Sequence, residues 1–283
     1  MQVVETVAQV RDQLARWRQQ GQSIALVPTM GNLHDGHMSL VDRAGELADR
    51  VCATIFVNPS QFGPGEDFEQ YPRTPEHDMA LLSEGGCDLL LTPSVAEMYP
   101  TGQDNSTRVR VPGSDQGLCD ASRPGHFDGV ATVVTALLNI FQPHVAIFGE
   151  KDFQQLMVIR RLVKDLHLPV TIVGSPTVRE ASGLAVSSRN RYLDEDQKQR
   201  AAAIYAALCA VRDGVQAGHP QDDVSTGAWR SMQAAGLEPE YLELRRTLDL
   251  APASPEDLEL VVLTAARMGG TRLIDNLSFP RTP

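Results

Sequence analysis

Short apolar runs that end at turn-forming residues recur through the first part of the chain and alternate with longer amphipathic stretches. The runs cover residues 24–27, 52–57, 88–91, 145–148 and 170–173, and each is followed within two residues by proline or glycine. Runs this short, apolar on both faces, are typical of parallel strands that are covered on both sides. The stretches between them, at residues 38–48, 75–85, 130–141 and 153–166, have the spacing of amphipathic helices. The alternation predicts a doubly wound, Rossmann-like α/β domain, whose ligands bind beyond the carboxyl ends of the strands.

The pattern changes in the last hundred residues. Residues 201–215 and 224–235 favour helices, whereas residues 241–246, 259–266 and 271–274 favour strands of a small mixed sheet. We therefore expect two domains. The first, Rossmann-like and ligand-binding, covers residues 1–178, and a smaller α+β lid domain covers residues 179–283.

Composition and charge limit the partners that this chain is expected to bind. The net charge is −11, which disfavours binding to nucleic acid or to an anionic membrane. Four scattered cysteines lack the short spacings of zinc or redox sites, and no apolar window is long enough for a membrane span. The N-terminus lacks the basic and apolar pattern of a secretory signal. We expect a soluble cytoplasmic protein that binds neither nucleic acid nor membrane.

The segment PTMGNLHDGH, residues 28–37, joins a predicted strand to a predicted helix. Gly31 lets the backbone turn and approach a ligand, and the free N–H groups of the following helix start suit phosphate oxygens. His34 and His37 are three residues apart and would project to the same side of a helical turn. Two unrelated surface histidines are the alternative, and a metal pair is disfavoured because no acidic or cysteine ligand lies at a helpful local spacing. The candidate nucleotide-binding residues here are Met30, Gly31, Asn32, Leu33, His34, Asp35, Gly36 and His37.

Two further segments carry groups that suit a nucleotide. Gly149, Glu150, Lys151 and Asp152 stand where a strand passes into a helix, although a solvated charged helix start would look the same. Residues 186–189, Val-Ser-Ser-Arg, bring two hydroxyls, backbone N–H groups and a guanidinium into one turn, which is a phosphate-binding combination.

Two glutamines are candidates for a second ligand. Gln61 and Gln155 each offer a donor and an acceptor, which suits a molecule with hydroxyls and a carboxylate. Surface or capping amides are the alternative, and the two side chains alone do not decide between these readings.

These segments occur in order with several other unusual strings. The strings are VNPSQF from Val57, YPRT from Tyr71, RPGHFDGV from Arg123, FGEKDFQQ from Phe148, SSRN from Ser187 and TRLIDN from Thr271. Together, over residues 27–276, they resemble the pantothenate synthetase (pantoate–β-alanine ligase) family of the nucleotidylyltransferase superfamily. The resemblance implies adenylation of pantoate by ATP, followed by attack of the β-alanine amine on the pantoyl adenylate to give pantothenate and AMP.

The resemblance also implies roles for individual residues. His34, His37 and Lys151 would be catalytic, and Gln61 and Gln155 would bind pantoate, with Gln61 also near β-alanine. Val178 would lie against adenine. ATP would be held by residues 30–37 and 149–152, Val178, Val186, Ser187, Ser188 and Arg189. The chemistry of ATP implies Mg²⁺ bound with the nucleotide, although no dedicated carboxylate site is evident in the sequence, and the family implies a homodimer.

Some positions are left open. Ala136 stands where the family commonly has lysine, and this change affects either a surface charge or a phosphate contact. Arg123 and His126 either touch substrate or brace the fold, with bracing preferred. Arg272, Asp275 and Asn276 are interpreted as residues of domain or subunit packing. Two other functions remain as alternatives: a nucleotidylyltransferase that moves AMP onto a phosphate acceptor, and a non-catalytic nucleotide sensor.

Overall fold

The computed structural model describes residues 1–63, 68–112, 118–119 and 123–281. The described residues divide into two units. One contains residues 1–112, 123–150 and 155–176, and the other contains residues 177–281 together with Leu118, Cys119 and Lys151–Gln154.

Parallel strands form the sheet of the first unit in the spatial order β1-β4-β3-β2-β5-β6. Their bounds are β1 (Gln2–Val4), β2 (Ile24–Thr29), β3 (Arg50–Ile55), β4 (Leu89–Leu91), β5 (Val145–Gly149) and β6 (Thr171–Ser175). Because the strands are parallel, the carboxyl ends of the neighbours β3, β2 and β5 meet at one edge of the sheet. The segments after Thr29, Ile55 and Gly149 therefore leave the sheet at that edge.

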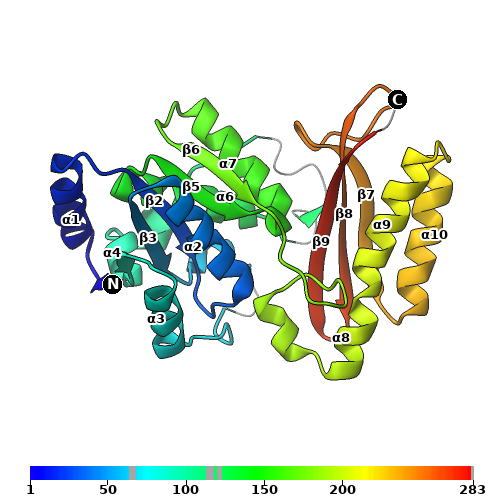
Figure 1. Ribbon diagram of the computed structural model, residues 1–283, viewed down its shortest axis with the longest axis horizontal. Coiled ribbons are helices and arrows are strands. Elements are labelled where there is room, and N and C mark those ends of the chain that lie inside the picture. The colour runs from blue at the N-terminus through cyan, green and yellow to red at the C-terminus, as the bar shows by residue number, and fades with distance from the viewer. Residues whose placement is uncertain (64–67, 113–117, 120–122, 282–283) are drawn as a thin grey trace. The chain divides into compact units, whose positions relative to one another are not determined.

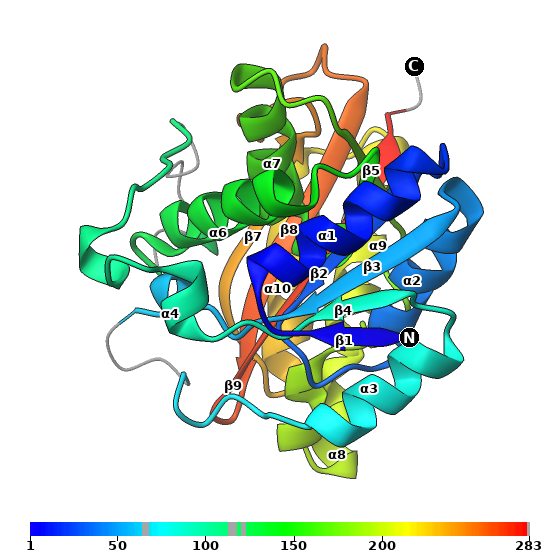
Figure 2. The same cartoon turned by 90° about the vertical axis from the view of Figure 1, so that its left-hand side faces the viewer.

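Helices cover both faces of this sheet (Figures 1 and 2). The helices of this unit are α1 (Val7–Gln19), α2 (Asp35–Leu47), α3 (Pro75–Glu84), α4 (Val95–Met98), α6 (His126–Phe141) and most of α7 (Phe153–Asp165). Helices α1 and α6 pack against each other, as do α2 and α3. The chain moves from β2 through α2 in one direction and from β5 through α7 in the other, so right-handed crossovers place these two helices on opposite faces.

Strand β2 shows why the sheet needs this double cover. Its first four residues, Ile24, Ala25, Leu26 and Val27, are fully buried although successive side chains of a strand point to opposite faces. Ala25 and Val27 belong to the cluster that contains Val41 of α2. The continuous apolar runs of the sequence are thus explained, and the predicted doubly wound α/β fold is confirmed.

The first element of the sheet was not predicted from the sequence. Strand β1 is three residues long and pairs in parallel with β4. Helix α1 follows at once and begins with a capping box. The Thr6 side chain accepts the backbone N–H of Gln9, and the Gln9 side chain accepts the backbone N–H of Thr6. Helix α1 then buries Val10, Leu14 and Trp17.

The second unit packs helices on one face of a three-stranded sheet (Figure 1). Its elements are α8 (Glu195–Ala201), α9 (Ala203–Gln216), α10 (Gln221–Ala234), β7 (Glu238–Arg246), β8 (Glu259–Met268) and β9 (Thr271–Pro280). Helices α9 and α10 pair with each other and contact the strands. One apolar cluster joins them, with Ile204, Leu208 and Val211 of α9 packed with Val262 and Ala266 of β8.

Two sequence-based expectations for this unit were wrong in detail. The sheet is antiparallel throughout rather than mixed. For β8 and β9 the reason is the two-residue turn Gly269-Gly270, which can connect only antiparallel neighbours. The helix expected over residues 201–215 is α9, which begins two residues later, at Ala203, and α8, which precedes it, was not predicted.

No helix in the described part of the chain combines the length and the apolar character that a membrane span requires.

Short 3-10 turns follow several strands or loops. They are η1 (Pro59–Gln61), η2 (Gln103–Asn105), η3 (Glu150–Asp152) and η4 (Ser188–Tyr192). Helix α6 lies against η1 so closely that a Cβ added at Gly129 would collide with the Ser60 carbonyl oxygen.

Replacing Gly129 by alanine is expected to lower the free energy of unfolding by about 1–3 kcal/mol, because the added methyl group has to push α6 away from η1. Gly227 in α10 is the matched control, since a Cβ there would meet nothing within 4 Å. Gly227→Ala should be stabilising by about 0.5–1 kcal/mol because glycine costs entropy inside a helix. Denaturant unfolding of both variants measures the difference, and equal effects would contradict the packing described here.

Candidate active site

The loop between β2 and α2 is held by a buried carboxylate from α3. Asp78 is 1% exposed and accepts the backbone N–H groups of Asn32 and Leu33, both at 2.8 Å. The Thr74 hydroxyl donates to the same carboxylate at 3.0 Å. At the start of the loop, the Thr29 hydroxyl donates to the Thr54 carbonyl and receives the N–H of Gly31. These bonds fix the backbone from residue 29 to residue 33.

Gly31 is required by both its conformation and its surroundings. Its φ of +81° lies in the left-handed region, and a Cβ would stand 2.9 Å from Asp78 Oδ2 and 3.0 Å from Ile55 Cγ2. Asn32 also has a positive φ, of 52°. The loop therefore turns sharply over two residues and brings the chain directly to the start of α2.

The two histidines lie together at the start of α2. The helix begins at Asp35, three residues earlier than the sequence pattern indicated, so His34 is its N-cap and His37 lies in its first turn. The imidazole centroids are 4.1 Å apart and the rings are tilted by 38°. Both residues are partly exposed, as are Asn32 and Gly36, while Leu33 is buried and Asp35 is exposed. Two adjacent imidazoles at a positive helix end can donate hydrogen bonds to an anion.

Gln61 lies in η1, after β3, and the orientation of its amide is set by Asn58. The Asn58 side chain, 1% exposed, accepts the Ser60 N–H with its oxygen and donates to the Gly129 carbonyl with its NH₂ group. These backbone groups therefore fix the orientation of the Asn58 amide. The Asn58 amide also donates to Gln61 Oε1 at 3.1 Å. The Gln61 NH₂ group therefore points the other way, toward the Met30 sulfur at 2.8 Å.

The hydroxyl of Tyr99 reinforces this arrangement by donating to Asn58 Oδ1 at 2.7 Å. Burial raises the pKa of Tyr99 and outweighs the hydrogen bonds with Ser60 and Asn58, so the hydroxyl keeps its proton.

Arg123 and His126 brace the Gln61 backbone. A guanidinium nitrogen of Arg123 and Nδ1 of His126 both donate to the Gln61 carbonyl, at 3.3 and 2.7 Å. The carbonyl can only accept, so the imidazole carries a proton on Nδ1. Of the two readings left open by the sequence, these contacts support bracing.

The segment after β5 opens at the same edge of the sheet. A Cβ at Gly149 would meet nothing within 4 Å, whereas a Cβ at Gly174 in the neighbouring strand would collide with the Glu150 side chain. Lys151 is partly exposed and Asp152 is exposed. Gln155, in the first turn of α7, is partly exposed, and its neighbour Gln154 is buried, with Oε1 accepting the Cys119 N–H. Ala136 lies partly exposed in α6.

Residues 178–186 of the second unit form a short hairpin. Val186 N–H donates to the Val178 carbonyl at 2.9 Å, and Arg179 pairs with Ala185 in an antiparallel bridge. The chain then enters η4, where the Ser187 hydroxyl accepts the Arg189 N–H. Val178, Val186, Ser187, Ser188 and Arg189 are all partly exposed. The hydroxyl, guanidinium and helix-start groups are thus gathered in one turn.

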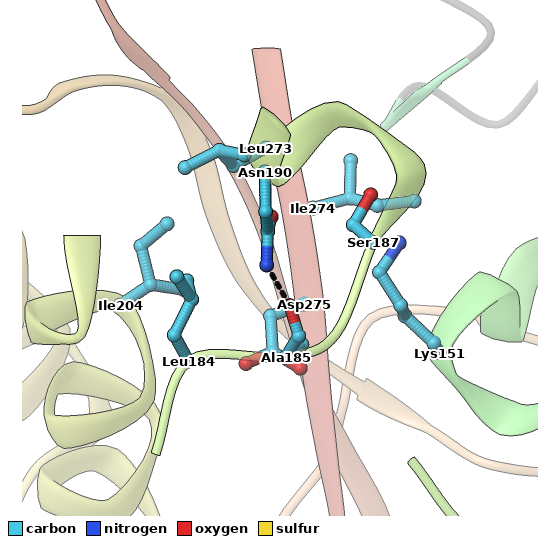
Figure 3. A pocket seen from close by; sticks show the side chains of 9 residues that line it. All are labelled: Lys151, Leu184, Ala185, Ser187, Asn190, Ile204, Leu273, Ile274 and Asp275. Atoms are coloured by element: carbon cyan, nitrogen blue, oxygen red, sulfur yellow. Dashed lines mark hydrogen bonds between the residues drawn. The ribbon is translucent and has the colours of Figure 1, made fainter. Parts of the chain in front are cut away.

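A small cavity lies beside this turn within the second unit (Figure 3). Its wall has apolar and polar parts. The lining residues are Lys151, Leu184, Ala185, Ser187, Asn190, Ile204, Leu273, Ile274 and Asp275. Asn190 fixes one side of it by donating to the Ala185 carbonyl and to Glu180 Oε1. The structure therefore brings Lys151 and Ser187, which are distant in sequence, to a common cavity.

The chain matches a known protein family over nearly its whole length. The sequence profile of the family named Pantoate-beta-alanine ligase matches residues 2–278. The chain belongs to this family.

Individual relatives of the pantoate–β-alanine ligase family agree with this assignment. A pantothenate synthetase of Pseudomonas paraeruginosa is 57% identical over 279 residues, covering 98% of this chain and 99% of that protein. The crystal structure of pantothenate synthetase from Thermus thermophilus superposes with a TM-score of 0.91 at 45% identity, covering 98% of this chain and 99% of that one. Pantoate-beta-alanine ligase from Francisella tularensis, "complexed with Beta-gamma ATP and Beta-alanine", has a TM-score of 0.81 at 34% identity, covering 98% and 97% of the two chains.

Family membership confirms the resemblance drawn from the motif strings, and with it the enzyme class. It leaves the roles of the individual site residues as predictions. Sequence reasoning did not find Asp78, Asn58, Tyr99 or Asn190, which fix the candidate residues. Asn58 lies inside a quoted motif, but Asp78 carries no local signal because its partners are 45 and 46 residues away.

Asp78→Asn is expected to lower the free energy of unfolding by about 1–3 kcal/mol, because an amide has one acceptor oxygen and leaves the N–H of Asn32 or Leu33 without its charged partner. Asp42→Asn, on the exposed side of α2, is the control and should stay within about 0.5 kcal/mol of the parent. Urea unfolding followed by circular dichroism measures both. An Asp78→Asn protein as stable as the control would show that the carboxylate does not hold the loop.

Proposed function

We propose that this protein condenses pantoate with β-alanine, using ATP, and releases pantothenate, AMP and pyrophosphate through a pantoyl adenylate. The observation that carries this proposal is membership of the pantoate–β-alanine ligase family over residues 2–278. A carboxylate is a poor acyl donor, so it needs activation before an amine can attack it. In the first step a pantoate carboxylate oxygen attacks the α-phosphorus of ATP, and the bond from that phosphorus to pyrophosphate breaks. In the second step the β-alanine amine attacks the acyl carbon, loses a proton and displaces AMP.

The start of α2 supplies groups for the first step. Negative charge on the phosphate oxygens rises as pyrophosphate departs, and preorganised donors lower the barrier where that charge develops. His34 and His37 lie together at the positive end of α2, and the loop before them is rigid because Asp78 holds it. These two imidazoles and the ammonium of Lys151 are proposed to stabilise the transition state.

The remaining candidates are assigned to the parts of the two substrates. The backbone of residues 30–37, the segment 149–152 and Val178 would hold the nucleoside and phosphates, with Val186, Ser187, Ser188 and Arg189 on the phosphates. Gln61 and Gln155 would bind pantoate. The orientation of Gln61 supports this assignment, since its NH₂ group has a second N–H besides the one that faces the Met30 sulfur, and an amide N–H binds carboxylate and hydroxyl oxygens.

Magnesium is proposed to enter with ATP. Among the described residues, no group of three histidine, cysteine or acidic side chains is arranged to hold a metal ion. In nucleotide enzymes Mg²⁺ is commonly held by one or two carboxylates together with phosphate oxygens and water, and it neutralises phosphate charge. We further infer that the protein works in the cytoplasm as a homodimer, a state that light scattering of the purified chain would measure.

The test of the reaction mixes the protein with ATP, Mg²⁺, pantoate and β-alanine and follows pantothenate, AMP and pyrophosphate. Equal amounts of the three products are expected. Reaction of another acid and amine in the absence of pantothenate formation would contradict the substrate assignment. With ¹⁸O in the pantoate carboxylate, a ligase puts label into AMP, whereas an enzyme that transfers AMP to a phosphate acceptor releases none and a nucleotide sensor gives no product.

His37→Ala is expected to slow adenylation about a hundredfold or more, because it removes a donor to the departing pyrophosphate. Pantoate-dependent release of pyrophosphate in a single turnover measures this step. His77→Ala, on the exposed side of α3, is the matched control and should keep the parent rate. A His37→Ala protein with the same rate as this control would remove His37 from the proposed mechanism.

A further inference from the structure

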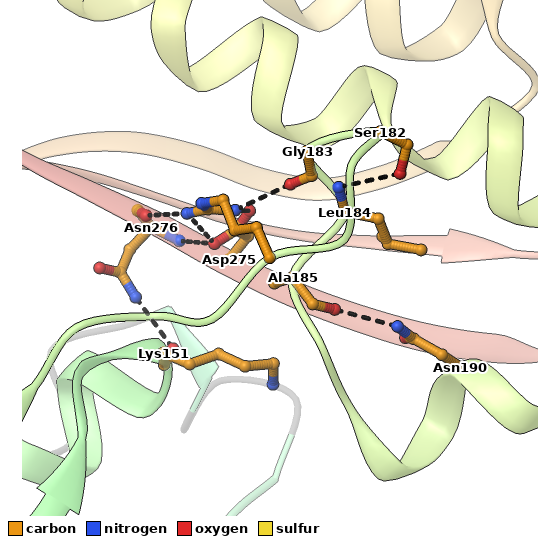
Figure 4. A network of polar contacts seen from close by, with 9 residues as sticks. Lys151, Ser182, Gly183, Leu184, Ala185, Asn190, Asp275 and Asn276 are labelled. Atoms are coloured by element: carbon orange, nitrogen blue, oxygen red, sulfur yellow. Dashed lines mark hydrogen bonds and ion pairs between the residues drawn. The ribbon is translucent and has the colours of Figure 1, made fainter. Parts of the chain in front are cut away.

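Two consecutive polar residues of β9 are buried. Asp275 is 4% exposed and Asn276 is 6% exposed. A buried carboxylate and a buried amide both need hydrogen-bond partners, since an unpaired polar group inside a protein is costly. Their hydrogen-bond partners belong to two segments of the candidate site, the hairpin of residues 178–186 and the segment that contains Lys151 (Figure 4).

Asp275 is paired with Arg179, which belongs to the hairpin before Ser187. The guanidinium donates to both carboxylate oxygens, at 2.6 and 3.0 Å, and also to the Gly183 and Asn276 carbonyls, at 3.2 Å each. Its carbon lies 3.8 Å from the centroid of the Tyr205 ring. The Gly183 contact closes the turn of the hairpin, so β9 fixes the path of the chain into Ser187.

Asn276 contacts the segment that contains Lys151. Its side-chain amide donates to the carbonyl of Lys151 at 2.9 Å, and its backbone N–H donates to Asp275 Oδ1 at 2.8 Å. The Lys151 backbone and the hairpin are therefore tied to adjacent residues of one strand. Lys151, Ser187 and Asp275 also line one cavity, which shows that these ties converge.

Stability alone is a weak reason for this network. A buried ion pair costs much of its Coulomb energy in desolvation, and apolar residues of similar size often stabilise a protein as well or better. The network gives directional contacts, which apolar residues would not. A bidentate guanidinium and an amide N–H fix the positions of the particular atoms that they bind.

We propose that Asn276, with Asp275 and Arg179 behind it, is a positioning residue that sets the place of Lys151 relative to the Ser187–Arg189 turn for the adenylation step. The inference rests on the proposed function, because it takes Lys151 and this turn as the groups that bind the ATP phosphates. Asn276 is buried and acts through the Lys151 carbonyl.

The test uses Asn276→Ala, which removes the amide donor without adding charge, and compares the two half-reactions. Pantoate-dependent exchange of pyrophosphate into ATP reports adenylation, and conversion of supplied pantoyl adenylate by β-alanine reports the second step. Exchange should fall about tenfold, the size expected for one lost hydrogen bond that positions a catalytic group, while the second step keeps its rate. Asn139→Ala, on the exposed side of α6, is the matched control and should change neither rate.

A double-mutant cycle with Lys151→Ala tests whether Asn276 acts through Lys151. If Asn276 acts through Lys151, then Asn276→Ala causes no further loss of exchange in the Lys151→Ala protein. An additive loss, an equal fall in both half-reactions, or an Asn276→Ala protein with the parent exchange rate would each overturn the inference. Thermal unfolding checks that the variants are folded, and Asn276→Ser replaces Asn276→Ala if the latter does not fold.

The same measurements separate this inference from the function on which it rests. A parent protein that makes no pantothenate removes the proposed function itself. A Lys151→Ala protein with full exchange overturns the role of Lys151 and this inference, while the condensation stands.

Discussion

The first unit depends on one constraint: the strands of its sheet are parallel and buried on both faces. Apolar residues at successive positions of β2 can be buried only if helices cover both sides, and parallel neighbours can be joined only by crossovers that supply such helices. The same constraint sends the chain out of β3, β2 and β5 at one edge. The loop with Gly31, the turn with Gln61 and the segment after Gly149 follow those three ends, so the candidate residues of this unit collect at one place as a consequence of the fold.

Buried polar side chains then fix the segments that leave the sheet. Asp78 holds the backbone before His34, Asn58 sets the direction of the Gln61 amide, and Asn276 holds the backbone of Lys151. In each case the side chain binds backbone groups or another buried amide rather than pointing at the open site. A loop must leave regular secondary structure to reach a ligand, and its backbone groups then need other partners. The same hydrogen bonds that satisfy this requirement also make the loops rigid.

Much of the fold could be predicted from sequence, and the parts that could not have physical reasons. Helices α2, α3, α6 and α7 and the strands from β2 to β6 follow from the period of apolar residues, which depends only on local geometry. Helix α1, although 13 residues long, was not predicted. Strand β1 was missed because three residues carry too little pattern, and only its pairing with β4 makes it a strand. The antiparallel arrangement of the small sheet depends on which strands become neighbours, and helix α8 was missed because its seven residues carry little periodic pattern.

The sequence by itself determined the chemistry-bearing groups and their order, and the resemblance that they support was confirmed by the family match. His34 and His37 lie together because they are three residues apart at the start of α2, which is local. Only the tertiary structure decided which distant side chains hold these groups: Asp78 for the loop, Tyr99 (through Asn58) for Gln61, and the Arg179–Asp275 pair with Asn276 for Lys151. The reason is that a hydrogen bond depends on where two atoms lie in space, and for residues far apart in the chain that position is set by the packing of the whole unit.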